Sequence, residues 1–275
     1  MAETIDFAGK AVFVAGGTSG INLGIALGFA RAGARVAVMS RSPEKVDAAV
    51  ARLRAAGAEA MGTAADVRDY AATEAALKAA HDAYGDFDVL VSGAAGNFPA
   101  PALGMSANGF KSVVDIDLLG SFHVLRAAHP FLRKPGASVI NISAPQAEAP
   151  MAMQAHVCAA KAGVDMLTRV LAMEWGRDGI RINSVIPGPI DETEGMARLA
   201  PTPQARALVE RSVPLGRMGV AEDVAAACRL LSSPLAGFIT GAVLPVDGGW
   251  SLGGAAASMG VIAEQAMAAA AKAKG

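Results

Sequence analysis

The sequence predicts an α/β protein with a doubly wound, parallel, seven-stranded sheet, helices on both faces, and a single domain. Short apolar runs alternate along the whole chain with Ala-rich amphipathic stretches. The runs are apolar at successive positions, which is typical of parallel strands that are covered on both faces. No linker or internal repeat divides the 275 residues, so the β–α alternation implies one sheet.

The strands are expected where β-branched and apolar residues form runs of about five to seven between turn residues. In chain order these runs are Lys10–Ala15, Arg35–Ser40, Ala58–Thr63, Phe87–Ser92, Ala137–Ser143, Ile180–Val185 and Ala242–Val246.

The helices are expected in the amphipathic stretches between the strands. Gly33 ends the first helix because glycine adopts left-handed geometry easily. Ser42 and Pro43 supply an N-cap and a first-turn proline for the second. The expected helices are Ile21–Ala32, Ser42–Ala56, Tyr70–Ala83, a continuous Ser106–Leu132, Met153–Gly176, Glu192–Leu199 and Val220–Ser232. We therefore expect one domain over residues 1–252, and an Ala-rich tail over 253–275 that forms a marginal helix or a frayed end, or a helix that faces a partner.

Composition excludes several classes of function. The chain is 53% hydrophobic and carries 24 Lys+Arg against 25 Asp+Glu, so it can bury a core but offers no bulk attraction to nucleic acid or anionic lipid. No run of about 18 uncharged apolar residues is present, and the first ten residues lack a signal-peptide pattern. Cys158 and Cys228 are isolated and the four His are scattered. We expect a cytoplasmic protein with no metal, no disulfide framework, no membrane partner and no nucleic-acid partner.

A glycine-rich turn joins the first strand to the first helix. Backbone N–H groups of such a turn and the positive end of the helix can bind a pyrophosphate, although a tight turn could need glycine for steric reasons alone. The turn supplies the expected cofactor contacts Gly16, Thr18, Ser19, Gly20 and Ile21.

These features resemble the short-chain dehydrogenase/reductase family from about Phe7 to Trp250. The resemblance rests on the Gly16-x-x-x-Gly20 spacing, Asp66-Val67, Ala94-Ala95-Gly96, Lys161 and Pro187-Gly188. It implies a Rossmann fold, with Asp66 and Val67 flanking an adenine and Ile190 meeting a nicotinamide. Asn22 stands where the family usually has its third glycine, so it would either contact the phosphates or crowd them.

The end of the second strand indicates the choice of cofactor. An NAD-binding sheet places an acid there to hold the ribose 2′-hydroxyl, whereas this chain has Ser40 and Arg41 and no acid before Glu44. A guanidinium suits a 2′-phosphate, so we expect NADP(H); the alternative is a solvated arginine just past a strand.

The usual acid–base residues of the family are missing. The family places a Tyr four residues before its Lys, but here Val157 precedes Lys161; Ala144 takes the serine position, with Ser143 beside it, and Asp117 takes the asparagine position. A narrower resemblance accounts for these losses. The segments Ala94–Phe98, Asp115–Asp117, Gln154–His156, Glu174–Gly176, Pro187–Ile190 and Thr193–Gly195 are similar to 2,4-dienoyl-CoA reductases, especially the peroxisomal-type branch, which also lacks the Tyr.

The resemblance implies NADPH-dependent reduction of a 2,4-dienoyl-CoA. Hydride adds at C5, negative charge spreads to the thioester oxygen, and a proton reaches the α-carbon, so no phenol is needed at the carbon that receives hydride. Lys161 would bind the ribose, and Asp117 would supply the proton through a water. Asp247 could assist; the alternative is that Asp-Gly-Gly after the last strand shapes a turn. The alternative for Asp117 is a structural helix residue that bonds nearby backbone.

The expected substrate contacts are Asn97, Phe98, His156, Met196 and Arg198. Ser143, as a catalytic candidate, together with His156 and Asn97, would donate hydrogen bonds near the thioester. Arg198 would reach CoA phosphates or be a solvated surface residue. Two other functions stay open: another short-chain reductase acting on a 3-oxoacyl or enoyl thioester or a ketone, and a non-catalytic NADP(H)-binding pseudoenzyme. The resemblance also implies a homotetramer.

Overall fold

Seven parallel strands form one sheet in the computed structural model, which describes residues 5–272. The strand order is β3-β2-β1-β4-β5-β6-β7, and every neighbouring pair is parallel. The strands are β1 Ala11–Ala15, β2 Arg35–Ser40, β3 Ala60–Ala64, β4 Val89–Ser92, β5 Ser138–Ile142, β6 Arg181–Pro187 and β7 Val243–Val246. The strand order reverses between β1 and β4, which confirms the predicted doubly wound fold and defines the switch point where such sheets bind ligands.

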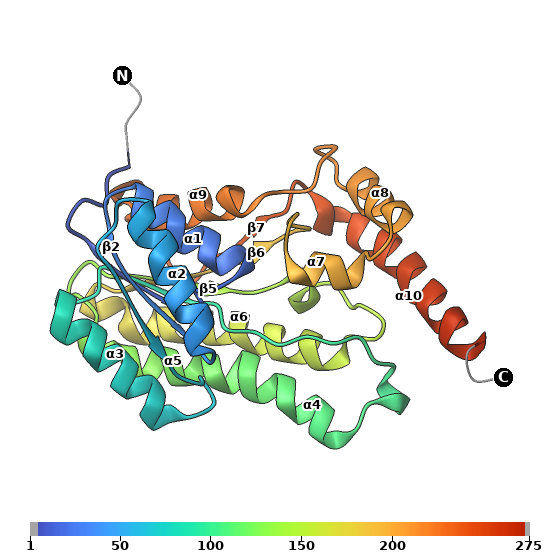
Figure 1. The fold of residues 1–275 in the computed structure, drawn as a ribbon, viewed down its shortest axis with the longest axis horizontal. Helices are drawn as coiled ribbons and strands as arrows, with labels where there is room; N and C mark the ends of the chain where they lie inside the picture. The colour runs from blue at the N-terminus through green and yellow to red at the C-terminus, as the bar shows by residue number, and fades with distance from the viewer. Residues whose placement is uncertain (1–4, 273–275) are drawn as a thin grey trace.

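Helices cover both faces of the sheet (Figure 1). Helices α1, α2 and α9 lie on one side, and α3, α4, α5 and α6 lie on the other. The α-helices are α1 Gly20–Arg31, α2 Pro43–Ala55, α3 Tyr70–Tyr84, α4 Ala107–Val114, α5 Gly120–Ala128, α6 Ala155–Trp175, α7 Glu194–Leu199, α8 Pro203–Ser212, α9 Ala221–Ser232 and α10 Gly254–Lys272. Shorter helical turns are η1 Ala102–Gly104, η2 Asp115–Leu119, η3 His129–Phe131, η4 Pro145–Ala147, η5 Gly176–Asp178, η6 Pro234–Ala236 and η7 Trp250–Leu252.

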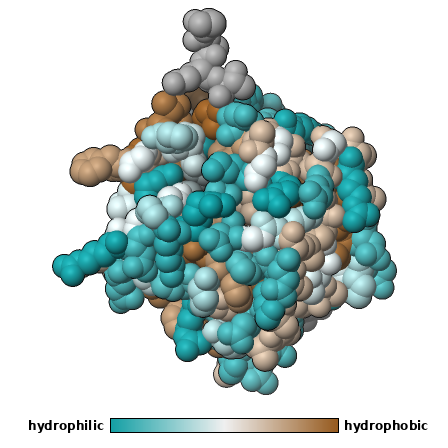
Figure 2. Space-filling model, turned by 90° about the vertical axis from the view of Figure 1, so that its left-hand side faces the viewer, coloured by the Kyte–Doolittle hydropathy of each residue, from teal (hydrophilic) through white to brown (hydrophobic). Residues whose placement is uncertain are grey.

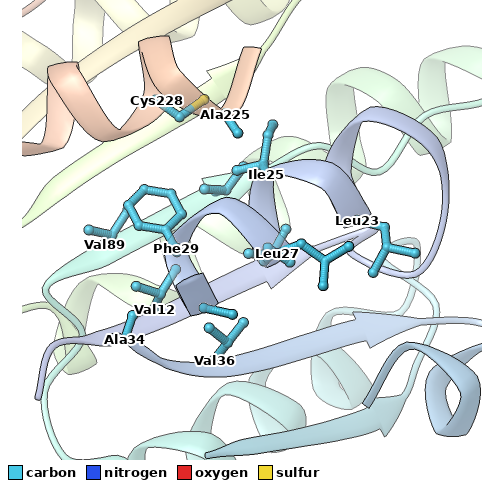
Figure 3. Packing of buried hydrophobic residues seen from close by; sticks show 14 of the residues in the cluster. Val12, Leu23, Ile25, Leu27, Phe29, Ala34, Val36, Val89, Ala225 and Cys228 are labelled. Carbon is cyan, nitrogen blue, oxygen red and sulfur yellow. The ribbon is translucent and has the colours of Figure 1, made fainter. Parts of the chain in front are cut away.

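The core on the α1 side shows why these segments pack as they do. Ile25 and Phe29 of α1 are fully buried, and they lie among Val12 of β1, Val89 of β4 and Ala225 of α9 (Figure 3). Each large apolar side chain buried in this way stabilises the fold by roughly 1.5–3 kcal/mol. This packing holds the middle and second half of α1 against the first halves of β1 and β4.

The outer surface is mixed in character. On the face drawn in Figure 2, hydrophilic and hydrophobic residues are interspersed. Within residues 5–272, no helix combines the length and the apolar character needed to cross a bilayer.

The local signals for helix ends agree with the structure. The Ser42 hydroxyl accepts a hydrogen bond from the Lys45 amide at 3.2 Å, with Pro43 in the first turn of α2. Gly33 has φ +90°, as its position after α1 requires. Several strand ends differ by one or two residues; β3 begins at Ala60 instead of Ala58, and β4 at Val89 instead of Phe87.

The continuous helix expected over Ser106–Leu132 is wrong in one respect. A π-helical turn, η2, separates α4 from α5. Such a turn inserts an additional residue into the helix and rotates the side chains that follow it, and π-turns often occur at functional sites. The apolar pattern did not reveal it because η2 keeps the chain helical on both sides.

Two helices near the C-terminal end differ from the sequence expectation. Helix α8 was missed altogether. The tail that we expected to be marginal forms α10, and its Ala255 and Met259 are buried with Met151, Val213 and Trp250. Burial of one side of α10 against this cluster gives an Ala-rich segment a reason to be helical.

Candidate active site

A cleft of about 680 Å³ opens at the carboxyl ends of the strands, beside the crossover between β1 and β4. Most residues predicted from the sequence line it. They are Gly16, Thr18, Ser19, Gly20, Ile21, Arg41, Asp66, Val67, Ala94, Ala95, Gly96, Asn97, Asp117, Ser143, Lys161, Pro187, Gly188, Ile190, Met196 and Arg198. Three predicted residues, Phe98, His156 and Asp247, do not line this cleft.

The glycine-rich turn between β1 and α1 forms one wall of the cleft. Gly16 has φ +76°, and a Cβ atom there would lie 2.8 Å from the backbone nitrogen of Ala94. Glycine is therefore required both by the backbone conformation and by the close approach of the loop after β4. The turn leads directly into the N-terminus of α1, which favours a bound anion.

Asn22 fits into this wall without filling the cleft. Its Nδ2 atom donates to the carbonyl oxygen of Gly93 at 2.6 Å, so the side chain is turned toward the loop after β4. Its Oδ1 atom is buried and has no hydrogen-bond partner. The Asn22 side chain thus links the turn before α1 to the loop after β4. In this position it leaves room for a dinucleotide at the turn.

The end of β2 brings cations to the cleft. Arg41 and Lys45 both line it, and the Lys45 ammonium lies 3.6 Å from a carboxylate oxygen of Glu194 on α7. Asp66 also lines the cleft, but Arg68 holds its carboxylate with a closest N–O distance of 2.6 Å. The hydrogen bond from Arg68 lowers the pKa of Asp66. This wall of the cleft can accept a phosphate next to Arg41 because the Asp66 carboxylate is already paired with Arg68.

Lys161 and Asp117 form the charged centre of the cleft. Their side chains are about 95% and 99% buried, and Lys161 Nζ lies 3.5 Å from Asp117 Oδ2. Lys161 Nζ also donates to the carbonyl oxygen of Ile142 at 2.9 Å, and the Gly96 amide donates to Asp117 Oδ1 at 2.7 Å. Asp117 lies in η2, so the π-turn places its carboxyl between the loop after β4 and helix α6.

Burial dominates the protonation of Asp117. It raises the pKa of this carboxyl, while the Lys161 ammonium and the Gly96 amide oppose the rise without cancelling it. A carboxyl with a raised pKa retains its proton at higher pH than an exposed aspartic acid, which is the property of a general acid.

No phenol reaches this centre. The chain has two tyrosines, Tyr70 and Tyr84, and neither lines the cleft. Val157 and Ala144 line it at the two positions where a hydroxyl was expected to be missing. The adjacent Ser143 lines the cleft and is 4% exposed, and its hydroxyl has no hydrogen-bond partner.

Phe98 and His156 lie together beside the cleft. Their rings are 4.6 Å apart in an edge-on arrangement, His156 is fully buried, and both of its ring nitrogens lack a hydrogen-bond partner. The expectation that they contact a ligand directly is not supported by their position outside the cleft lining.

The expected catalytic role of Asp247 does not agree with its surroundings. Its carboxylate accepts hydrogen bonds from the Gly249 amide, the Ser251 amide and the Ser251 hydroxyl, all at 2.6–2.8 Å. It lies in the wall of a separate cavity. These local bonds use both oxygens to shape the turn after β7, which is the alternative that the Asp-Gly-Gly pattern left open.

Two polar residues, Gln146 and Asp165, were not predicted from the sequence. Gln146 lines the cleft, and its amide donates to Gln154 Oε1 at 2.7 Å; Asn97 donates to the same oxygen at 3.5 Å. Asp165 is buried on α6, four residues after Lys161. The i, i+4 spacing from Lys161 could have indicated Asp165, since it places both side chains on one helix face.

The fold and the cleft together define a dinucleotide-binding oxidoreductase of the short-chain dehydrogenase/reductase family, and the chain belongs to that family. The family model described as "Enoyl-(Acyl carrier protein) reductase" matches residues 15–251.

Among curated relatives, the chain is similar to peroxisomal 2,4-dienoyl-CoA reductase [(3E)-enoyl-CoA-producing] of Rattus norvegicus. The two are 42% identical over 242 residues, which cover 87% of this chain and 83% of the relative. It is also similar to a Bacillus subtilis protein named "Probable 2,4-dienoyl-CoA reductase [(2E)-enoyl-CoA-producing]", at 38% identity, with 87% of this chain and 96% of the relative covered.

Solved structures give the same family. A dehydrogenase/reductase from Sinorhizobium meliloti 1021 superimposes with a TM-score of 0.83 at 33% identity, covering 90% of this chain and 96% of that chain. A short chain dehydrogenase from Bacillus anthracis gives a TM-score of 0.79 at 34% identity, covering 88% and 96%.

Proposed function

We propose that this protein is an NADPH-dependent reductase of an unsaturated acyl-CoA thioester, with a 2,4-dienoyl-CoA as substrate. The observation that carries the proposal is the buried Lys161–Asp117 pair, 3.5 Å apart, in a cleft that no tyrosine lines. The relatives named as 2,4-dienoyl-CoA reductases support the same substrate class.

The charge distribution suits conjugate reduction. NADPH, when bound, supplies a hydride. In a dienoyl thioester the negative charge moves along the conjugated chain to the thioester oxygen, so the protein must stabilise an oxyanion and protonate a carbon. The Lys161 ammonium supplies positive charge, and preorganised groups of this kind contribute about 3–4 kcal/mol each to the transition state. A phenol would have no alkoxide to protonate.

Asp117 is the proposed proton source, acting through a water. Its raised pKa keeps a proton available, and the Gly96 amide fixes its orientation. A positioned acid of this kind contributes roughly 10²–10⁴-fold to the rate. Asp247 takes no part in this step, because its two oxygens accept hydrogen bonds from local donors.

The cations at the end of β2 favour NADP(H) over NAD(H). Arg41 and Lys45 would bind the 2′-phosphate, and the Glu44 carboxylate accepts a hydrogen bond from the Ser42 hydroxyl at 2.6 Å without lining the cleft. Lys161 would also bind the nicotinamide ribose. Met196 and Arg198 of α7, together with Asn97, would contact the acyl-CoA.

We further propose a homo-oligomer in the cytoplasm. Helices α4, α5 and α6 expose large apolar side chains, which supports association through this face as in the tetramer implied by the family resemblance. These are Phe110, Phe122, Met166, Val170 and Met173.

NADPH consumption with 2,4-hexadienoyl-CoA tests the proposed function. We expect turnover of this thioester and none of a 3-oxoacyl-CoA, with roughly 100-fold lower kcat for Asp117→Ala and Lys161→Ala. The exposed Lys78→Ala variant serves as a matched control, since Lys78 pairs with Asp82 on the outside of α3, away from the cleft.

Other outcomes decide between the alternatives. Reduction of the 3-oxoacyl substrate alone would indicate another short-chain reductase. NADPH binding without oxidation by any dienoyl or enoyl thioester would indicate a pseudoenzyme. Full activity of Asp117→Ala would remove Asp117 from the mechanism.

A further inference from the structure

Three carboxamide side chains meet beside the cleft. Gln154 is 2% exposed and does not line the cleft, and its Oε1 atom accepts two hydrogen bonds. Gln146 Nε2 donates to it at 2.7 Å, and Asn97 Nδ2 donates at the longer distance of 3.5 Å. Gln146 and Asn97 both line the cleft. One buried oxygen therefore holds two amide groups that a ligand in the cleft can reach.

The two donating amides lie on the same segments as the partners of the charged pair. The loop after β4 carries Asn97 directly after Gly96, whose amide donates to Asp117 Oδ1 at 2.7 Å. The segment after β5 carries Gln146, and the last residue of β5 supplies the carbonyl oxygen that accepts from Lys161 Nζ at 2.9 Å. A substrate that reaches the charged pair is therefore near both amides.

The start of α6 is built to hold this arrangement. Gln154 occupies the N-cap position of α6, but its side chain makes no capping hydrogen bond and is instead bonded to Gln146 and Asn97. The preceding Met153 has φ +66°, which is uncommon for a residue with a side chain, and its carbonyl oxygen accepts a hydrogen bond from the Ala100 amide at 2.9 Å. Backbone conformations of this kind are costly and cluster at active sites. The start of α6 is thus tied to the loop that carries Asn97.

The hydrogen bonds to Gln154 leave each of the two amides with a free donor. A carboxamide nitrogen carries two hydrogens, and Gln154 Oε1 accepts one from each side chain. Neither Gln146 Nε2 nor Asn97 Nδ2 has another acceptor among residues 5–272. Because a carboxamide is planar, holding one hydrogen also fixes the direction of the other. The cleft therefore offers two N–H donors whose orientation is set before a ligand binds.

Reduction of a conjugated thioester requires donors of this kind. The proposed reaction places negative charge on the thioester oxygen, while the family's serine and tyrosine positions hold Ala144 and Val157. The Ser143 hydroxyl oxygen is buried, and the Lys161 ammonium is shared with Asp117 and a backbone carbonyl. Further donors have to come from other side chains that line the cleft.

We propose that Asn97 and Gln146 donate their free hydrogens to the thioester oxygen of the substrate, and that Gln154 is the positioning residue that orients both amides. This inference rests on the proposed function. The sequence indicates Asn97 as a donor near the thioester; Gln146 adds the second donor, and Gln154 adds the group that holds the two together.

Substitutions of Gln146 and Gln154 test the two roles. Interactions that strengthen in the transition state act on kcat, so we expect Gln146→Leu to lower kcat roughly 100-fold while KM for 2,4-hexadienoyl-CoA changes by less than about threefold. Gln154→Met, which is similar in length but has no carboxamide, should lower kcat roughly 10–100-fold because the amides are misplaced. The matched control is Gln204→Leu, the same change at an exposed glutamine of α8 outside the cleft, and it should behave like wild type.

A combined variant separates positioning from a general effect on the fold. If Gln154 acts only through the two amides, Gln154→Met should cause no further loss of kcat in the Asn97→Ala/Gln146→Leu background. Unchanged NADPH binding by each variant shows that the fold is intact. A further loss in that background as large as in the wild type would mean that Gln154 acts by another route, and would overturn its assigned role.

The absorption spectrum of bound 2,4-hexadienoyl-CoA reports on the same hydrogen bonds without turnover. With NADP⁺ in place of NADPH no hydride is available, and polarisation of the thioester carbonyl shifts the dienoyl band to longer wavelength. We expect this shift in the wild type and in Gln204→Leu, and a smaller shift in Gln146→Leu and Gln154→Met at saturating substrate. An undiminished shift in both variants, or a raised KM with unchanged kcat, would overturn the inference.

The proposed function fails in a different way. If the wild type reduces no dienoyl-CoA, the proposed function is wrong and this inference is wrong with it. If the wild type reduces the thioester and Gln146→Leu and Gln154→Met are fully active, only the inference is wrong.

Discussion

At the residue scale, the charged side chains of this cleft differ in whether they have an ion-pair partner. Asp66 is paired with Arg68 and Asp117 with Lys161, whereas Arg41 has no carboxylate within ion-pairing distance among the described residues. Asp165 is unpaired and buried. Arg41 is exposed and therefore available to a phosphate, whereas burial without a counter-charge raises the pKa of the Asp165 carboxyl.

Arg41 provides a prediction about cofactor choice. Arg41→Ala removes hydrogen bonds to a charged phosphate, worth about 1.5–3 kcal/mol, so kcat/KM for NADPH should fall roughly 10–100-fold. The value for NADH, which lacks this phosphate, should change little. Steady-state kinetics with both cofactors measure the ratio. The control is Arg52→Ala, on the exposed face of α2 and outside the cleft; equal losses for both cofactors would argue against a 2′-phosphate contact.

At the element scale, the structure contains two helical elements that the sequence pattern did not predict. The turn η2 differs from an α-helix in its hydrogen bonding and not in its apolar pattern, so periodicity could not reveal it. Helix α8 was missed although its start has the same signal as α2: Thr202 precedes Pro203, as Ser42 precedes Pro43. The sequence of α8 is short and weakly apolar, so its N-cap signal was overlooked although it is present.

That cap can be tested. Thr202 Oγ1 accepts a hydrogen bond from the Ala205 amide at 3.1 Å. Thr202→Ala should destabilise α8 by about 1 kcal/mol, which corresponds to roughly fivefold faster amide exchange in its first turns. Thr202→Ser, which retains the hydroxyl, should exchange at the wild-type rate. Unchanged exchange in the alanine variant would mean that packing against α10 determines this helix.

At the scale of the whole molecule, an ion cluster around the buried Asp88 carboxylate joins the N-terminal strand to the middle of the chain. Asp88 accepts hydrogen bonds from Lys10, the Ala11 amide and Arg133. Burial would raise its pKa, but these three donors outweigh burial, and the pKa of Asp88 lies below its usual value. The cluster ties β1 to the start of β4 and to the segment before β5.

The cluster predicts how stability depends on pH. A carboxyl whose pKa is lower in the folded state stabilises the fold above its unfolded pKa of about 3.9, and this contribution is lost as the pH falls through the folded pKa. We expect Asp88→Asn to lower the free energy of unfolding by about 1–3 kcal/mol near neutral pH, with the difference from wild type shrinking below about pH 4. Urea denaturation across this range measures it. A difference that is independent of pH would show that the carboxylate charge is not responsible.

The sequence by itself determined the parallel sheet and the glycine-rich turn, because these depend on local pattern and on spacing along one element. It also placed Lys161 and Asp117 among the candidates, through a family resemblance. Only the tertiary structure decided that Asp117 and Lys161 are 3.5 Å apart, that Asp247 uses its oxygens in a turn, and that the carboxyl oxygens of Asp165 are buried without a hydrogen-bond partner. Burial and ion pairing depend on which segments the fold brings together, and residues distant along the chain carry no local signal of that contact.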